Sequence, residues 1–257
     1  MKRLAVWLFA LFFPLPLAAG GVWFAAQGWP QSWRSADWSS AGIAPDPAGN
    51  GEAIVQVYTA RAGSWRGIFA VHSWLLIKPE DASGFSRYEV TAWGSPVHRN
   101  RHAPDGRWYS NMPQVIYDLR GEEAARLIPR IEAAIRAYPH NERGGYRSWP
   151  GPNSNSFIAA IARAVPGFDL VLPPVALGKD YVGDGVYLVQ APSKTGWQLS
   201  LAGILGLTLA REEGLEVNLF GLVGGVNPLA ATVSLPSLGR VDLAGLASSA
   251  LAAFMAN

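Results

Sequence analysis

Cysteine is absent from this 257-residue sequence. The chain therefore cannot form a disulfide, bind a metal through thiolates or use a cysteine nucleophile. Histidine is nearly as scarce, with four residues, so chemistry that depends on histidine has few candidates. Charged residues make up only 16% of the chain, against about a quarter in ordinary soluble domains, and this shortage favours contact with a membrane.

Several functional signatures are also missing. The net charge is only +2, and the cationic side chains are scattered along the chain, so we expect no nucleic-acid partner. No glycine-rich phosphate loop, Gly-x-Ser-x-Gly elbow or His-Glu-x-x-His motif is present. His98 and His102 are four residues apart, but arginines flank them and no helical pattern supports a shared face. The sequence therefore gives no reason to expect a metal or an organic cofactor.

Apolar residues make up 49% of the chain, and the first long apolar run lies at its beginning. Lys2 and Arg3 precede a nearly uncharged stretch over 4–26, which reaches the roughly 20 residues needed to span a bilayer. We predict a transmembrane anchor over 1–27, with the bilayer as its partner. The basic end should stay in the cytoplasm, which places the main domain on the periplasmic side of a bacterial inner membrane as a single-pass protein. A cleaved signal peptide ending near Ala19 is the alternative, but the apolar run continues past that site.

The pattern after the anchor predicts a linker over 28–51 and an α+β domain over 52–195. Alternating apolar residues over 53–59, 67–77 and 87–93 indicate three strands of an antiparallel meander, with a further strand over 113–119. Residues 97–112 are polar and lack a period, which is typical of a surface loop. Apolar residues at helical spacing predict a helix over 121–138, with Pro129 kinking or breaking it.

The tail over 196–257 is apolar and rich in glycine and leucine. Segments 215–223 and 229–235 resemble strands with a turn-rich connection, so we predict a β-hairpin that covers the domain or lies on the membrane. A short apolar helix is expected over 243–255.

A second helix begins abruptly within the stretch from Pro150 to Phe157. Prolines and a glycine prevent regular structure up to Pro152, and apolar residues then recur at helical spacing to about Val165. Asn153 or Ser154 is the natural N-cap. A helix N-terminus also favours developing negative charge, so Ser154 is a candidate nucleophile as well as a candidate cap.

His72 lies in the middle of a predicted strand between apolar neighbours. It is either a core histidine bonded to a backbone carbonyl or a general base with a tuned pKa. Glu89, on the following strand, is the candidate to orient its ring, and Tyr88 is the competing candidate.

Two motifs together resemble a known family. Val71-His72-Ser73-Trp74, and Gly151 to Phe157 opening a helix, are similar to the bacterial domain of unknown function 3750 family. A more distant similarity is to circularly permuted papain-like proteins of the NlpC/P60 group, in which a strand histidine precedes an Asn-Cys-Asn motif at a helix start. Here Ser154 falls at the position of that cysteine. The resemblance implies a permuted papain-like α+β fold with an antiparallel sheet packed against helices.

The resemblance implies a membrane-anchored hydrolase of the cell envelope, acting on an amide or ester bond in a cell-wall peptide or a lipid. Ser154 would be the nucleophile, His72 the general base and Glu89 the orienting group. The binding residues would be Asn153, Asn155, Ser156, Tyr88, Trp74 and Trp149. Two alternatives stay open: an inactive relative that binds a peptide, glycan or lipid in the same cleft, and a structural protein of the inner membrane.

Overall fold

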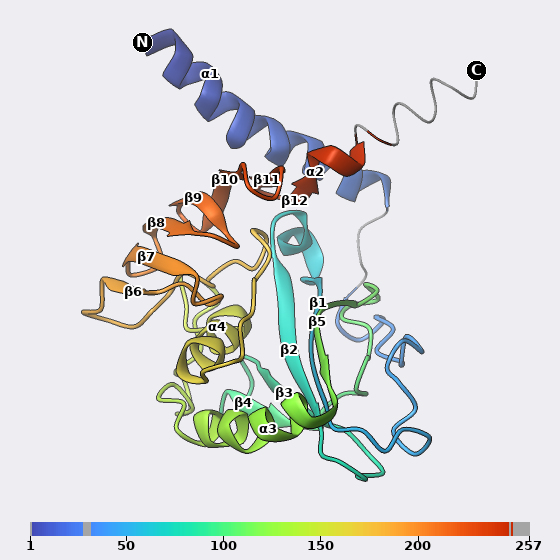
Figure 1. Ribbon diagram of the computed structural model, residues 1–257. Coiled ribbons are helices and arrows are strands. Elements are labelled where there is room, and N and C mark those ends of the chain that lie inside the picture. Colours follow the sequence, from blue (N-terminus) through green and yellow to red (C-terminus); the bar gives the residue numbers. More distant parts are fainter. Residues whose placement is uncertain (1, 28–31, 247, 249–257) are drawn as a thin grey trace.

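The computed structural model describes residues 2–27, 32–246 and 248. Two antiparallel sheets and a few helices make it an α+β fold, preceded by an apolar N-terminal helix (Figure 1). The elements of the first sheet and its helices are β1 (Ile54–Arg61), the 3-10 helix η1 (Ser64–Ile68), β2 (Val71–Lys78), β3 (Ser86–Val90), β4 (Val97–Arg99), β5 (Gln114–Arg120), α3 (Gly121–Arg136) and α4 (Ser154–Ala164).

The first sheet has the order β4-β3-β2-β1-β5, and all its strands are antiparallel. Its central strands are the predicted ones, although β2 begins only at Val71 because η1 occupies the start of the predicted segment. β4 lies within the segment predicted to be a loop. β3 pairs with β2 only from Trp74 to Ile77, so the first residues of β2 have an unpaired edge on that side.

One face of this sheet carries the main core. Apolar side chains of β1 and β2 pack against α3 and α4, with Leu75, Ile131, Phe157 and Ile158 almost completely buried. The sequence predicts that Pro129 kinks or breaks α3; the helix runs without a break from Gly121 to Arg136. The amphipathic packing of α3 therefore outweighs the hydrogen bond that a proline removes.

A smaller aromatic core lies on the opposite face. Tyr58 and Trp74 stack with a ring separation of 5.5 Å, and Trp108 packs with them. The linker crosses this face, where the rings of Trp38 and Trp108 meet edge-on with a centroid separation of 5.2 Å. Residues 97–112, which we expected to be a surface loop, also fold over this face and bury Trp108.

The tail supplies six strands of a seven-stranded meander whose first strand precedes Gly196, so the predicted two-stranded hairpin is wrong. The order of the sheet is β12-β11-β10-β9-β8-β7-β6. Its strands are β6 (Leu188–Gln190), β7 (Gly196–Leu201), β8 (Leu205–Ala210), β9 (Gly214–Leu219), β10 (Leu222–Asn227), β11 (Thr232–Leu235) and β12 (Gly239–Asp242). Most of the helix predicted over 243–255 lies outside the described residues.

Buried ion pairs stabilise the inner face of this second sheet. Lys179 Nζ lies 2.9 Å from Glu216 and 3.0 Å from Asp180, and all three side chains are buried. Glu216 also accepts hydrogen bonds from Ser234 and Arg240. Burial opposes the charge on Lys179, but the two carboxylates outweigh burial and raise its pKa. A paired ion of this kind is tolerated in the interior because its partners satisfy it.

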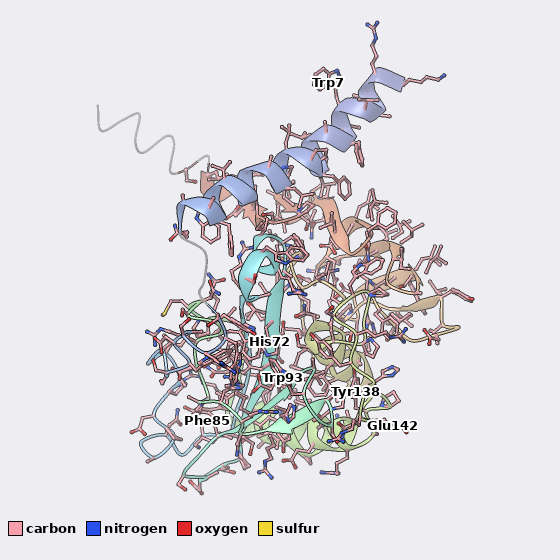
Figure 2. The ribbon with its side chains drawn as sticks, turned by 180° about the vertical axis from the view of Figure 1, so that it is seen from behind. Trp7, His72, Phe85, Trp93, Tyr138 and Glu142 are labelled. Carbon is pink, nitrogen blue, oxygen red and sulfur yellow. The ribbon has the colours of Figure 1, made fainter. Side chains whose placement is uncertain are left out.

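The N-terminal segment forms two consecutive helices, α1 (Lys2–Phe12) and α2 (Pro14–Ala26). Together they span 25 residues with a mean hydropathy of 1.9, which is long and apolar enough to cross a membrane. α1 projects beyond the domain and Trp7 points away from it (Figure 2). α2 packs on η1 and on the second sheet, and this contact buries Gly20 and Phe24.

Ser237, in the turn between β11 and β12 of the second sheet, contacts α2, η1 and β1. Its hydroxyl donates a hydrogen bond to the Ile68 carbonyl of η1. Its carbonyl accepts one from Arg61 of β1 at 2.7 Å. Gly20 of α2 lies so close that a Cβ atom there would fall 1.5 Å from the Ser237 hydroxyl oxygen.

This contact predicts different effects for two adjacent glycines of α2. Gly20→Ala should lower the free energy of unfolding by about 1–3 kcal/mol, because the new methyl group displaces Ser237. Gly21 has no atom within 4 Å of an added Cβ, so Gly21→Ala should be neutral or slightly stabilising. Thermal denaturation in detergent micelles measures both variants. Equal stability of the two would show that α2 does not dock at Ser237.

Candidate functional site

The start of α4 is fixed by a capping box. Asn153 is the N-cap, and its side-chain oxygen accepts hydrogen bonds from the backbone N–H groups of Asn155 and Ser156 at 2.9 and 3.0 Å. The Ser156 hydroxyl completes the box by accepting a bond from the Asn153 N–H at 2.7 Å. Of the two caps that the sequence allowed, the structure uses Asn153, which leaves the Ser154 hydroxyl free of a capping role.

Two asparagine side chains then dock this helix start onto β2. Asn155 donates to the Val71 carbonyl at 2.9 Å and accepts from the Ser73 hydroxyl at 2.6 Å. The amides of Asn153 and Asn155 both donate to the Leu177 carbonyl. All polar groups of these two side chains are thereby used inside the protein. Asn153, Asn155 and Ser156, predicted to bind a ligand, position the helix start in this structure.

His72 projects from the other face of β2, beside a buried carboxylate. Its Nε2 lies 2.9 Å from Glu89, and Trp108 stacks on the ring with a centroid separation of 3.7 Å. The other Glu89 oxygen lies 2.7 Å from His102 Nδ1, and Arg87 donates to Glu89 at 2.9 Å. Of the two predicted orienting residues, Glu89 is the one bonded to His72. Tyr88 points to the opposite face and packs against the main core.

The protonation states of this group follow from its burial. Burial alone would favour neutral Glu89, but the bonds from His102 and His72 and the charge of Arg87 hold its pKa well below the usual range. Burial lowers the pKa of His72, and the bond to Glu89 opposes that effect only in part. An ionised carboxylate only accepts, so Nε2 of neutral His72 carries the proton and Nδ1 keeps its lone pair. Nδ1 has no hydrogen-bond partner among the described residues.

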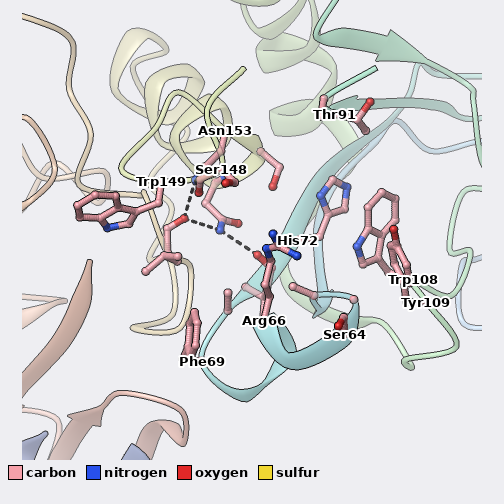
Figure 3. Close-up of a pocket in the computed structure, with 18 of the residues that line it drawn as sticks. Ser64, Arg66, Phe69, His72, Thr91, Trp108, Tyr109, Ser148, Trp149 and Asn153 are labelled. Atoms are coloured by element: carbon pink, nitrogen blue, oxygen red, sulfur yellow. Dashed lines mark hydrogen bonds between the residues drawn. The ribbon is translucent and has the colours of Figure 1, made fainter. Parts of the chain in front are cut away.

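His72 and Ser154 border one cleft of about 1240 Å³. They come from opposite faces of the first sheet and reach the same space at the unpaired edge of β2. Figure 3 shows Ser148, Trp149 and Asn153 on one side of the cleft and Trp108 and Tyr109 on the other. No hydrogen bond joins Ser154 to His72 in the part of the chain that the structure describes. Catalytic hydrogen bonds are often made only when substrate is bound.

The walls of the cleft are mainly apolar and come from the region around the first sheet, from the second sheet and from the N-terminal helix. Trp65, Ile68 and Phe69 of the η1 region form one wall, Phe220 and Leu222 of the second sheet form another, and Leu17 of α2 closes one end. The cleft therefore extends from the His72 side chain to the apolar N-terminal helix.

The predicted tryptophans differ in position. Trp149 is 44% exposed and lies at the cleft, with its indole nitrogen donating to the Phe220 carbonyl at 2.9 Å. Trp74 is fully buried against Tyr58, and its indole nitrogen donates to the Pro104 carbonyl. Trp74 is therefore a core residue without access to the cleft.

Sequence reasoning did not place four residues at the site. His102 and Trp108 lie in the segment taken for a surface loop, where no period indicated burial. Arg87 precedes Glu89 by two residues, so strand alternation alone could have placed it on the same face. Thr91 was within a predicted strand; the residue lines the cleft, and its buried hydroxyl has no hydrogen-bond partner among the described residues.

Comparison with known proteins gives one match. A family model described as "Protein of unknown function (DUF3750)" matches residues 52–181. This segment includes β1 to β5, α3, α4, and with them His72, Glu89 and Ser154. No curated protein and no solved structure matches the chain.

The buried carboxylate predicts a large effect on stability. Glu89→Gln should lower the free energy of unfolding by roughly 3–5 kcal/mol, because it leaves the charge of Arg87 buried without its counterion. Tyr88→Phe, at the neighbouring position on the other face, should leave stability nearly unchanged. Urea denaturation in detergent measures both. A small loss for Glu89→Gln would contradict the network described above.

Proposed function

This chain belongs to the DUF3750 family of proteins of unknown function, and we propose that it is a membrane-anchored hydrolase that cleaves an amide or ester bond. The main support is a single arrangement: His72 and Ser154 line one cleft, neither the Ser154 hydroxyl nor His72 Nδ1 has a hydrogen-bond partner among the described residues, and Glu89 bonds to His72 Nε2. The order of strand histidine and helix serine is that of permuted papain-like hydrolases. That similarity of fold stays part of the proposal.

The proposed reaction proceeds through an acyl-enzyme. His72 Nδ1 takes the proton of the Ser154 hydroxyl as its oxygen attacks the substrate carbonyl carbon. The Ser154 N–H, at the first turn of α4, has no acceptor among the described residues and would donate to the developing oxyanion. His72 then gives its proton to the leaving nitrogen or oxygen. Water, deprotonated by the same histidine, releases the acyl group, and Glu89 stabilises the imidazolium in both steps.

The lining of the cleft favours a substrate with a long apolar part. Trp65, Phe69 and Phe220 offer aromatic surface, and Leu17 places the far end of the cleft at the N-terminal helix. A peptide would need many polar partners, whereas an acyl chain needs only apolar contact. We therefore favour an acylated lipid over a cell-wall peptide, with the domain on the periplasmic side of the bacterial inner membrane.

A binding protein without catalysis is the second candidate. It is favoured by the missing hydrogen bond between Ser154 and His72 and by the mainly apolar lining of the cleft. In this case Ser154 would only begin the helix, and the same cleft would hold an acyl chain.

A fluorophosphonate probe distinguishes the two candidates. The full-length protein in detergent should be labelled covalently, and Ser154→Ala should abolish labelling because the nucleophile is lost. Ser148→Ala, which removes another hydroxyl beside the cleft, should leave labelling unchanged. Hydrolysis of long-chain p-nitrophenyl esters should fall by at least about 10³-fold in Ser154→Ala. Equal labelling of wild type and Ser154→Ala, or none of either, would leave only the binding function.

The pKa of His72 predicts the pH dependence of ester hydrolysis. The general base must be neutral, and burial holds its pKa below the ordinary 6.5. The value of kcat/KM should therefore rise with pH through a midpoint below 6.5 and reach a plateau near neutrality. Glu89→Gln removes the negative charge that raises this pKa and should move the midpoint to lower pH. His102→Gln keeps the bond between Glu89 and His72 and serves as the control. A midpoint above 6.5 in the wild type would contradict the role of His72.

A further inference from the structure

The outward side of β7, β8 and β9 is a continuous apolar surface. We define the exposed apolar face as Trp197, Leu199, Leu201, Leu205, Leu207, Leu209, Leu215 and Val217, whose exposed fractions run from 36% to 66%. Across the strands, Leu199 lies opposite Leu207, and Leu207 lies opposite Val217. No charged residue interrupts this face. Single exposed apolar residues are common on soluble proteins, but a contiguous patch of this kind marks a contact surface.

The polarity of this sheet is the reverse of that in an ordinary antiparallel sheet. The alternating residues Gln198, Ser200, Thr208, Glu216 and Asn218 are polar and point inward, and each is at most 4% exposed. They bond with interior groups: Asn218 donates to Asp180 at 2.8 Å and Glu216 accepts from Lys179. A sheet with one wet face turns its polar side to water. Apolar-out and polar-in is the pattern of strands that face lipid.

The inward bonds also fix which side faces out. A one-residue shift in pairing would turn the Leu side inward and expose the polar side. Such a shift would break the contacts among Lys179, Asp180 and Glu216, which are all buried. The apolar face is therefore held outward by the ionic interior beneath it.

The N-terminal helix continues the same surface. Val226 of β10 lies opposite Leu215, so β10 extends the outward side of the sheet. At Gly224 of β10, an added Cβ would contact Phe13 and Phe12 of the helix at 3.2 and 3.4 Å. A segment apolar enough to span a membrane thus covers one end of this side and leaves β7 to β9 uncovered. Figure 1 shows α1 and α2 running above β10 to β12.

We propose that the exposed apolar face inserts its side chains into the lipid leaflet next to the domain, as a second membrane contact beside the helix. Unpaired strand edges and the polar inner side cannot enter hydrocarbon, so the strands lie along the membrane surface and only the outward side chains are immersed. The exposed aromatic residues Tyr187, Trp197 and Phe220 suit the boundary with the headgroups. This proposal does not depend on catalysis.

The absence of cysteine allows a direct test on the full-length protein. Leu207→Cys and Val217→Cys each introduce one thiol on the exposed apolar face, and Arg126→Cys introduces one on the exposed side of α3 as a control. Each variant is labelled with an environment-sensitive fluorophore. Each is reconstituted into vesicles of phosphatidylcholine and phosphatidylglycerol, with or without bromine on the phosphatidylcholine acyl chains.

We expect emission at shorter wavelength for both labels on the exposed apolar face, and loss of most of their fluorescence in brominated vesicles. The Arg126→Cys label should show neither effect. Labels on the face that emit as in water would overturn the proposal. So would labels that emit as in an apolar medium but are insensitive to bromine, because protein rather than lipid would then cover the face. Chemical cross-linking between Leu207→Cys chains would identify that cover as a second copy.

Discussion

The docking of α4 onto β2 is the constraint on which the cleft depends. Asn155 bonds at once to the Val71 carbonyl, the Ser73 hydroxyl and the Leu177 carbonyl, and Asn153 caps the helix from the adjacent position. These amides are buried, so each bond that they make would leave an unsatisfied group if it were broken. They place the helix N-terminus, with Ser154 as its first residue, at the edge of β2 that carries His72.

Polar groups also determine the rest of the architecture. Glu89 joins the two histidines and Arg87 on the aromatic face of the first sheet. Lys179, with Asp180 and Glu216, ties the loop after α4 to the inner side of the second sheet. In both places charges are buried in groups that satisfy one another, while the N-terminal helix and the exposed apolar face carry many of the exposed large apolar side chains. This arrangement explains how a chain with so few charged residues can bury several of them.

The local pattern of apolar and polar residues predicted much of the fold. Strands β1, β2, β3 and β5, both domain helices and the apolar segment over 2–26 were predicted close to their observed positions, because each has an unambiguous period or terminator. The tail was not. Its strands alternate between leucine and a polar residue, a pattern that indicates strands but not which side is buried, and the buried side is decided by Lys179 and Asp180 far back in the sequence.

The candidate site was also predicted only in part. His72, Glu89 and Ser154 were predicted together, from the order of a strand histidine and a serine at a helix start, and the bond between His72 and Glu89 is present. Their approach around a strand edge depends on how far β3 pairs with β2, which no sequence period specifies. His102 and Trp108 are brought to the site by a loop whose course depends on Trp38 of the linker and on other tertiary contacts. The catalytic role of Ser154 stays a prediction.

The position of Ser237 couples several elements of the fold. It touches α2, η1 and β1 at one point, and η1 and the second sheet form facing walls of the cleft. Ser237 therefore links both walls to the N-terminal helix. A shift of that helix against the domain would displace both walls together.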